Sequence, residues 1–412
     1  MNRRLIAAAT LMLAGDAVAQ QFTTVSGTGD PTIDVPAVQA AVDQGGHVIL
    51  KGHFSFGAAP TVPEQPSPDP GLAGGMVLIS KTIAISGAVD DQGEMTSIEA
   101  GMNPFYVEAP GAHVTIQQLH FIHPKIYAIR VVAVTGLVIA SNRFEGIIPA
   151  AGSSAQTIVV ATSAGPPSAS NPGQPENVSG ALLIVNNDFD IQATAGTNYT
   201  GLNVFAVGKS PDKEVDLYIS GNNFRNGTGR QINVWSVDGR VYIERNSVTT
   251  PTFGANTTPS GDVIHIVGPG SFLVAHNIID CQWTSGQQAG IRLQTTANRP
   301  VSSAVVVDND VNMSAPEGAK FTATSAAIEI RGAGDSNIVV NNRIRGRANF
   351  ALSVANQNGT PQNTAFIMND LSGFTSAQAD VFVDAGGMNT IAVGAQSRVE
   401  DHGSGTLIVP VR

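Results

Sequence analysis

The chain has 412 residues, of which 42% are hydrophobic, 13% charged and 6% aromatic, and its formal net charge at pH 7 is −10. This acidic balance argues against a nucleic acid partner, so we predict none, and it gives no general attraction to polyanions. An acidic ligand would therefore need a local cluster of positive charge. The length alone would allow two or three ordinary domains.

Residues 1–19 have the pattern of a bacterial secretory signal peptide. Arg3 and Arg4 form a short positive start, an apolar stretch follows, and a small-residue cleavage site ends at Ala19. We expect a secreted or periplasmic protein. No later run of about 18 apolar residues follows, so no membrane span is expected. Cys281 is the only cysteine, which excludes an internal disulfide.

A short helix is predicted over about residues 34–46. Asp34 is a suitable N-cap, Pro36 suits the first turn, and Gly45 and Gly46 end the helix. Residues 47–56 then form the first predicted pair of strands. The helix would cover the open end of the sheet that follows, because such an end exposes apolar side chains and unpaired backbone.

Further on, an acidic turn contains Asp90, Asp91 and Glu94. Carboxylates suit Ca²⁺, but the ligand spacing of a calcium loop is missing, and an acidic turn is usually only solvated. We therefore predict no cofactor and no metal site, with calcium at this turn as the alternative.

From residue 142 onward, an asparagine recurs in one setting: β-formers, one or two polar residues, Asn, any residue, then an apolar residue. The sequences around Asn142 (LVIASNRF) and Asn277 (FLVAHNII) are examples. Irregular spacing of this kind is typical of stacked coils whose loops vary in length. We expect each Asn to adopt a left-handed corner and to bond to its neighbours along the stack, as an interior ladder. The ladder residues are Asn142, Asn187, Asn222, Asn246, Asn277, Asn309, Asn342 and Asn369.

Leu119 occupies the equivalent position one coil earlier, so the ladder is predicted to begin at Asn142. Residues 162–180 contain no strand pattern and are predicted to leave the stack as a loop excursion. Because a solenoid grows in one dimension, residues 20–412 are predicted to form one domain.

With its capping segment and its repeated strand–turn–strand units, the sequence resembles the right-handed parallel β-helix, or pectin lyase-like, superfamily over roughly residues 30–410. The resemblance implies an all-β, single-stranded right-handed parallel β-helix with three sheets and a short N-terminal capping helix. It does not identify an activity, because this fold serves lyases, hydrolases, epimerases, fructotransferases, adhesins and tailspikes. The motifs of polygalacturonases, mannuronan epimerases and calcium-dependent pectate lyases are missing.

The resemblance also implies that substrate lies across the outside of the first sheet. Alternation with period two decides which side chains point outward from its strands. In the middle of the stack, two neighbouring outward columns combine exposed aromatic rings, amides, arginines and a carboxylate, which suit a glycan groove. The predicted substrate-binding residues are Asn203, Phe205, Asn233, Trp235 and Gln294, and the predicted catalytic residues are His265, Arg292, Glu329 and Arg331.

Two mechanisms fit these residues. In β-elimination of a uronic acid polymer, Arg292 and Arg331 would neutralise the carboxylate and His265 would take the proton. Hydrolysis or fructosyl transfer would need two carboxylates, Glu329 with either Asp262 or Asp384. The competing interpretation is structural, with the arginines and Glu329 in weak cross-strand ion pairs.

The sequence thus predicts a secreted protein that acts on a polysaccharide or oligosaccharide. We favour a polysaccharide lyase-like enzyme. The alternatives are a glycoside hydrolase or fructotransferase, and a non-catalytic glycan-binding or surface-attachment protein. The sugar, its linkage and the oligomeric state are not determined by the sequence.

Overall fold

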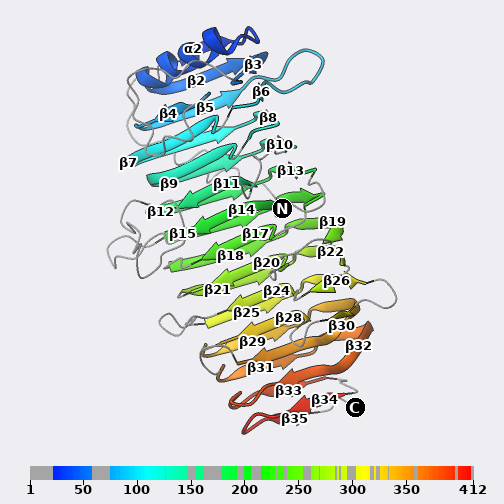
Figure 1. Cartoon of the computed structure of the whole chain (residues 1–412). Coiled ribbons are helices and arrows are strands. Elements are labelled where there is room, and N and C mark those ends of the chain that lie inside the picture. The colour runs from blue at the N-terminus through cyan, green and yellow to red at the C-terminus, as the bar shows by residue number, and fades with distance from the viewer. Residues whose placement is uncertain are drawn as a thin grey trace.

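The computed structural model shows one elongated stack of parallel strands with a helix at its N-terminal end (Figure 1). Every pair of named strands is parallel. The fold is the predicted right-handed parallel β-helix. The structure describes residues 22–57, 75–101, 103–125, 127–146, 155–161, 178–192, 199–205, 215–227, 230–235, 239–253, 261–268, 270–283, 285–286, 289–294, 303–315, 320–321, 325–332, 334–356, 361–394 and 398–409.

Each coil of the solenoid contributes strands to three sheets, and some long strands bend from one sheet into the next. The first sheet contains β4 (Val77–Ile79), β7 (Phe105–Gln117), β9 (Ile129–Ala140), β11 (Ala155–Ala161), β14 (Tyr199–Phe205), β17 (Ile232–Trp235), β20 (Ile264–Val267), β24 (Ala289–Gln294), β28 (Ala326–Arg331), β30 (Arg343–Ala355), β32 (Asp370–Val383) and β34 (Val399–Asp401).

The second sheet includes the latter parts of β7 and β9. Its other strands are β1 (Phe22–Ser26), β2 (Gly46–Lys51), β5 (Ile83–Gly87), β12 (Gly180–Val185), β15 (Val215–Ser220), β18 (Gly239–Glu244), β21 (Ser271–Ala275), β25 (Ser303–Val307), β29 (Asn337–Val340), β31 (Thr364–Ile367), β33 (Ile391–Val393) and β35 (Leu407–Val409).

The third sheet ends with the first parts of β30 and β32. Its other strands are β3 (His53–Ser55), β6 (Ser97–Glu99), β8 (His120–Ile122), β10 (Arg143–Glu145), β13 (Asp188–Asp190), β16 (Asn223–Arg225), β19 (Ser247–Phe253), β22 (Ile278–Trp283) and β26 (Asp310–Ser314). A separate short pair joins β23 (Ser285–Gly286) and β27 (Lys320–Phe321).

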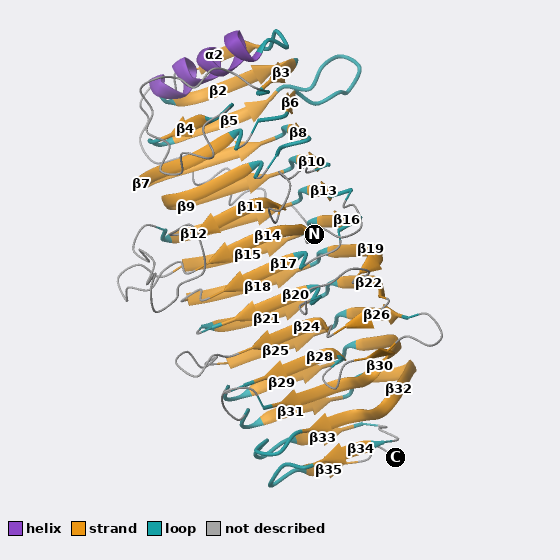
Figure 2. Ribbon diagram, viewed as in Figure 1, coloured by secondary structure: helices purple, strands orange, loops and turns teal. Residues whose placement is uncertain are grey.

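Helix α2 (Pro31–Gln44) lies over the N-terminal end of the stack, as Figure 2 shows, and so covers its apolar end. The predicted cap is confirmed, but its start is wrong. Asp30 is the N-cap and accepts from the backbone of Thr32, whereas Asp34 lies inside the helix and is buried. Its carboxylate accepts from the backbone N–H groups of Thr28, Gly29 and Ser55, and thereby fastens the helix to β3. This helix is not long and apolar enough to cross a membrane, and it is the only helix in the described part of the chain.

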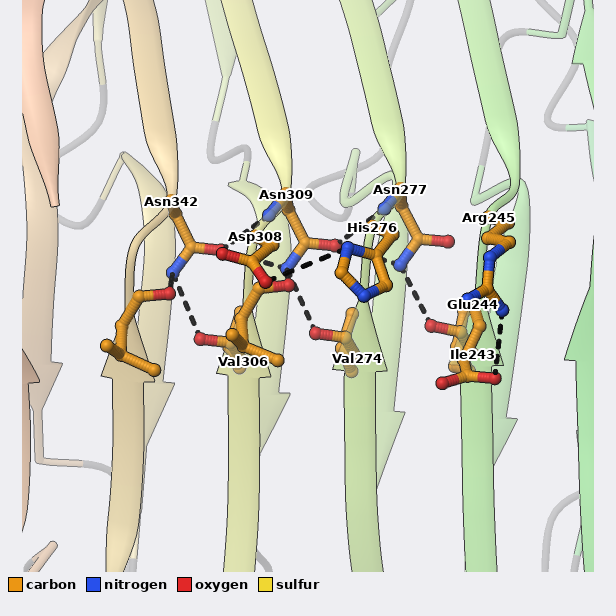
Figure 3. Close-up of polar contacts among 12 residues, drawn as sticks. Ile243, Glu244, Arg245, Val274, His276, Asn277, Val306, Asp308, Asn309 and Asn342 are labelled. Atoms are coloured by element: carbon orange, nitrogen blue, oxygen red, sulfur yellow. Dashed lines mark hydrogen bonds and ion pairs between the residues drawn. The ribbon is translucent and has the colours of Figure 1, made fainter. Parts of the chain in front are cut away.

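The ladder is confirmed for all eight asparagines. Asn277 and Asn309 show the repeating pattern in Figure 3. The Asn277 backbone N–H and Nδ2 both donate to Asn309 Oδ1, at 3.0 and 2.9 Å, and Nδ2 also donates to the carbonyl of Ile243 in the preceding coil. At the N-terminal end of the ladder, the backbone N–H of Leu119 donates to Asn142 Oδ1, so the first member is Asn142 as predicted.

The expected backbone role of the ladder asparagines is wrong, because the left-handed corner falls one residue earlier. The corner residues with φ between 53° and 68° are Ser141, Asn186, Gly221, Arg245, His276, Asp308, Asn341 and Met368. The corner turns the chain, and the Asn that follows it points inward, where it satisfies buried backbone groups of the neighbouring coil.

Apolar side chains fill the interior in columns along the stack. Behind the Asn corner, the rings of Phe121, Phe144, Phe189 and Phe224 stack with centroids 4.4–5.1 Å apart. Val248 and Ile279 continue this column in the next coils. The alternating pattern of the sequence therefore gives one continuous core.

Two predicted features meet the boundaries of the described residues. The signal peptide at 1–19 and residues 162–177 of the excursion lie outside them. The excursion ends before residue 180, because Val178 bridges to Val134 and Gly180 begins β12. In the acidic turn, Asp90 Oδ1 accepts from the backbone of Gln92 and Glu94, so that carboxylate already serves the turn itself.

We predict that Asn277→Ala lowers the free energy of unfolding by about 2–5 kcal/mol, because it leaves the backbone N–H of Asn246 and the carbonyl of Ile243 buried without their partner. Urea unfolding measures the loss. Asn223→Ala is the matched control, since Asn223 bonds to Asp188 on the partly exposed outer face of the third sheet. It should cost less than about 1 kcal/mol. Equal losses for the two variants would contradict an interior ladder.

Candidate functional site

The outward side chains of the first sheet align as the sequence predicts. In register, Asn203 pairs with Asn233, Asn233 with His265, His265 with Arg292, and Arg292 with Glu329. The neighbouring column passes through Phe205, Trp235, Val267, Gln294 and Arg331. Residues up to 128 positions apart in the sequence, Asn203 and Arg331, therefore share one outer wall, between β14 and β28 (Figure 1).

The expected exposure of this wall is wrong for the first column. Asn203, Asn233, His265, Arg292 and Glu329 are each less than 5% exposed. Each packs between neighbours in the coils on either side, and their hydrogen bonds to one another replace bonds to water.

In the second column, Trp235, Gln294 and Arg331 are partly exposed, so the indole of Trp235 is not the fully open platform that we expected. The side chain of Phe205 lies outside the described residues. The accessible part of the wall is therefore the rim formed by Trp235, Gln294 and Arg331.

A chain of hydrogen bonds fixes the orientation of His265. Asn233 Nδ2 donates to Asn203 Oδ1 at 2.7 Å, which leaves Asn233 Oδ1 as an acceptor for His265 Nδ1 at 2.8 Å. His265 Nδ1 therefore carries the proton in the neutral ring. The ring Nε2 lies 3.3 Å from Gln294 Oε1, so the Gln294 amide must turn its NH2 group toward the ring for Nε2 to hold the lone pair. The ring of Trp235 packs edge-on against the imidazole, with centroids 5.8 Å apart.

The surroundings keep His265 neutral. Burial is the main cause that lowers the pKa of His265 well below its usual 6.5, and the charges of Arg230, Arg292 and Arg331 add to it. The imidazole is therefore unprotonated at neutral pH and can accept a proton at Nε2.

Arg292 lies at the centre of a buried ion cluster. Its Nη1 is 2.7 Å from Asp262, and its Nε contacts Glu329 Oε2. Arg331 lies 4.0 Å from the other oxygen of Glu329, and Arg230 lies 3.7 Å from Asp262. The structural alternative correctly predicted ion pairs here. They are not weak surface pairs, however, because Asp262 and Glu329 are fully buried.

Sequence reasoning missed Arg230 in this cluster. Arg230 and Asp262 each stand two residues before an inward core residue, Ile232 or Ile264, and three before the outward residues Asn233 and His265. Period-two alternation extended upstream would place both side chains inward, so the pattern gives no signal for Arg230.

Of the two carboxylates considered as a partner for Glu329, the structure brings Asp262 to the cluster. Asp384 instead accepts from the backbone N–H groups of Asn356 and Ala385 at a turn. Burial raises the pKa of Glu329 above its usual value, even though the charges of Arg292 and Arg331 lower it.

The cluster has an excess of positive charge. Counted over the described residues, three arginines face two carboxylates across Arg230, Arg292, Arg331, Asp262 and Glu329, while His265 is neutral. This arginine-rich site lies in a protein whose overall charge is −10.

No family model matches the chain, and no curated protein matches it. Among solved structures, the A-module of mannuronan C-5 epimerase AlgE4 from Azotobacter vinelandii is 10% identical, with 94% of this chain and 96% of that chain covered and a TM-score of 0.39. The AlgE6 A-module from the same organism is 12% identical, with 94% and 98% covered and a TM-score of 0.32. The Dettilon tailspike protein gp208 is 11% identical, with 93% and 68% covered and a TM-score of 0.36. The fold assignment here rests on the strand pairing, and these likenesses carry no conclusion about activity.

We predict that Arg292→Met lowers the free energy of unfolding by about 3–5 kcal/mol, because it leaves two carboxylates buried without their shared partner. Arg345→Met is the matched control, since Arg345 pairs with Asp310 at 2.7 Å on a partly exposed surface. Its cost should stay below about 1 kcal/mol. Urea unfolding of both variants measures the difference. If Arg292→Met does not fold, Glu329→Gln tests the same pair, and a loss no larger than that of Arg345→Met would contradict the buried cluster.

Proposed function

We propose that this protein binds an acidic polysaccharide across the outer face of its first sheet, at the rim of Trp235, Gln294 and Arg331, and cleaves it by β-elimination. The observation that carries the proposal is the cluster of three arginines beside a neutral histidine, with Arg331 partly exposed at its rim. On the pattern of residues 1–19, we also propose that the protein acts outside the cytoplasm.

The charge of the cluster favours an acidic ligand. An anionic group bound at the rim would lie beside the partly exposed guanidinium of Arg331, in a site with little solvent where a charge-assisted hydrogen bond is strong. A neutral sugar would gain no such interaction. The half-buried ring of Trp235 offers the apolar surface on which a sugar ring can pack.

The chemistry follows from the state of His265. Its Nε2 would take the proton on C5 of the uronate, the electron pair would form a double bond between C4 and C5, and the bond from C4 to the bridging oxygen would break. Arg331 would stabilise the negative charge that develops on the carboxylate. Solvent would protonate the leaving oxygen.

Access to His265 requires the indole of Trp235 to move, because His265 is 1% exposed and its ring packs against that indole. The partly exposed indole would meet the sugar first. Arg292 would act indirectly, since its guanidinium is already bound to Asp262 and Glu329 and holds both in place.

A specific observation supports hydrolysis as a second candidate. Glu329, whose pKa is raised by burial, is joined through Arg292 to Asp262, so two carboxyl groups lie in one cluster. Glu329 would then act as the acid and Asp262 as the second carboxylate. Glycan binding without cleavage is the remaining alternative.

The test is to incubate the protein with matched acidic and neutral polysaccharides, and to follow the ultraviolet absorbance of unsaturated uronate, the reducing ends and the bound fraction. We expect unsaturated product from an acidic polymer. Reducing ends without that absorbance would favour hydrolysis, and binding with neither product would contradict an enzyme. Equal binding of neutral and acidic polymers would contradict the role of the arginine cluster.

Trp235→Ala should weaken binding by about tenfold, because it removes the aromatic surface under the sugar. Tyr242→Ala is the control, since Tyr242 lies on the outer face of the second sheet. His265→Gln should abolish the unsaturated product while binding is retained. An unchanged affinity of Trp235→Ala would remove this rim from the site.

A further inference from the structure

The outer face of the second sheet carries an apolar column that the proposed function does not use. Successive strands from β21 to β35 place one apolar side chain outward in register. The column is Leu273, Val305, Ile338, Ala365, Ile391 and Leu407.

A second apolar column runs beside it, two residues further along each strand. From β25 onward it consists of Val307, Val340, Ile367, Val393 and Val409. The two columns together are called the apolar face below. Polar side chains are absent from both columns between β25 and β35.

This face is open to solvent. Ile338, Ile391 and Leu407 are 41%, 39% and 54% exposed, and the other members are at least partly exposed. Most of the exposed large apolar residues in the described part of the chain lie after residue 337. An open apolar surface of this kind marks an interaction site on a soluble protein.

The third sheet shows that apolar outward residues are not a general property of these coils. At the same level of the stack, its outer face presents Asp280, Asp310, Asn312, Arg343 and Arg345. These side chains pair with one another, for example Arg345 with Asp310 at 2.7 Å. At this level of the stack, polar residues therefore cover the outer face of the third sheet, whereas apolar residues cover that of the second sheet.

The size and the border of the face resemble one half of a protein interface. Tyr218 and Tyr242, stacked 4.7 Å apart, extend the first column toward the N-terminus. A polar column borders the face and consists of Asp216, Arg240, Ser271 and Ser303. With this border, the surface from β15 to β35 measures roughly 35 by 20 Å, or about 700 Å², because neighbouring strands lie about 4.8 Å apart. A specific interface takes about 800 Å² from each partner, with an apolar centre and a polar rim.

The charges near the face argue against a lipid surface as its occupant. Its border holds ion pairs instead of a cluster of basic residues, namely Arg240 with Asp216, Arg245 with Glu244, and His276 with Asp308. The net charge of the chain is −10. Anionic headgroups would repel such a protein, because peripheral membrane binding relies on clustered basic residues. The face is also a regular sheet surface, and sheets pack face to face at about 10 Å when both surfaces are flat and apolar.

We propose that the apolar face binds the same face of a second copy of this chain, in a two-fold symmetric dimer. A two-fold axis through a flat apolar surface pairs each outward column with its equivalent, so one self-complementary patch is sufficient. The first sheet remains open on both copies, and the dimer carries two glycan sites.

Sedimentation equilibrium of the full chain tests the dimer, and we expect twice the mass of one chain at micromolar concentration. Ile338→Lys should raise the dissociation constant at least a hundredfold, because a charge would be buried at the centre of the contact. Ile338 lies on β29, inside the sheet between β25 and β31. The substitution therefore leaves the last strand, β35, unchanged, and a dimer formed by strand pairing at β35 would survive it.

Ile278→Lys is the matched control. Ile278 is 55% exposed and points outward from the third sheet, so this substitution adds the same charge to another wall and should leave the dimer intact. A wild-type protein that stays monomeric would overturn the proposal, as would a dimer that survives Ile338→Lys. Flotation of a wild-type monomer with phosphatidylcholine vesicles would assign the face to lipid instead.

Discussion

The hydrogen-bonded asparagine ladder is the interaction on which the rest of the structure depends. Each ladder side chain accepts from the backbone and amide of the preceding member and donates to a carbonyl of the preceding coil, so one residue satisfies buried groups of two coils. Because the ladder position is fixed in each coil from Asn142 to Asn369, the strands on either side of it are fixed in register over loops of very different length. A slip of one residue would turn every outward side chain inward.

That register creates the three outer walls and gives each its own chemistry. On the first sheet, it brings Asp262, Arg292 and Glu329 together from three coils and buries them, at a cost that a purely structural wall could avoid with apolar residues. The third sheet carries exposed polar pairs such as Arg345 with Asp310. The second sheet becomes apolar toward the C-terminus. One solenoid can thus hold a ligand on one wall and a partner on another without competition between them.

Sequence reasoning predicts most of this arrangement, because period-two alternation and the Asn repeat are local patterns that specify direction. The register of the column from Asn203 to Glu329 is confirmed residue by residue. Burial could not be predicted in this way. Whether His265 meets water depends on Trp235 and on the arginines of other coils, which are tertiary contacts. The helix start was misplaced for a related reason: Asp34 is a good capping residue, but its bonds to Gly29 and Ser55 hold it inside the helix.

The coil register is tested most directly by a disulfide between two coils. Ser271 and Ser303 are register partners 32 residues apart, and their hydroxyl oxygens are 3.3 Å apart. In the variant Ser271→Cys/Ser303→Cys, we expect a cross-link to form under mild oxidation, since neighbouring strands bring the two Cα atoms within the range that a disulfide spans. Ser271→Cys/Val305→Cys should not cross-link, because its diagonal distance is about 8 Å. No cross-link in the first variant, or equal cross-linking in both, would contradict the account.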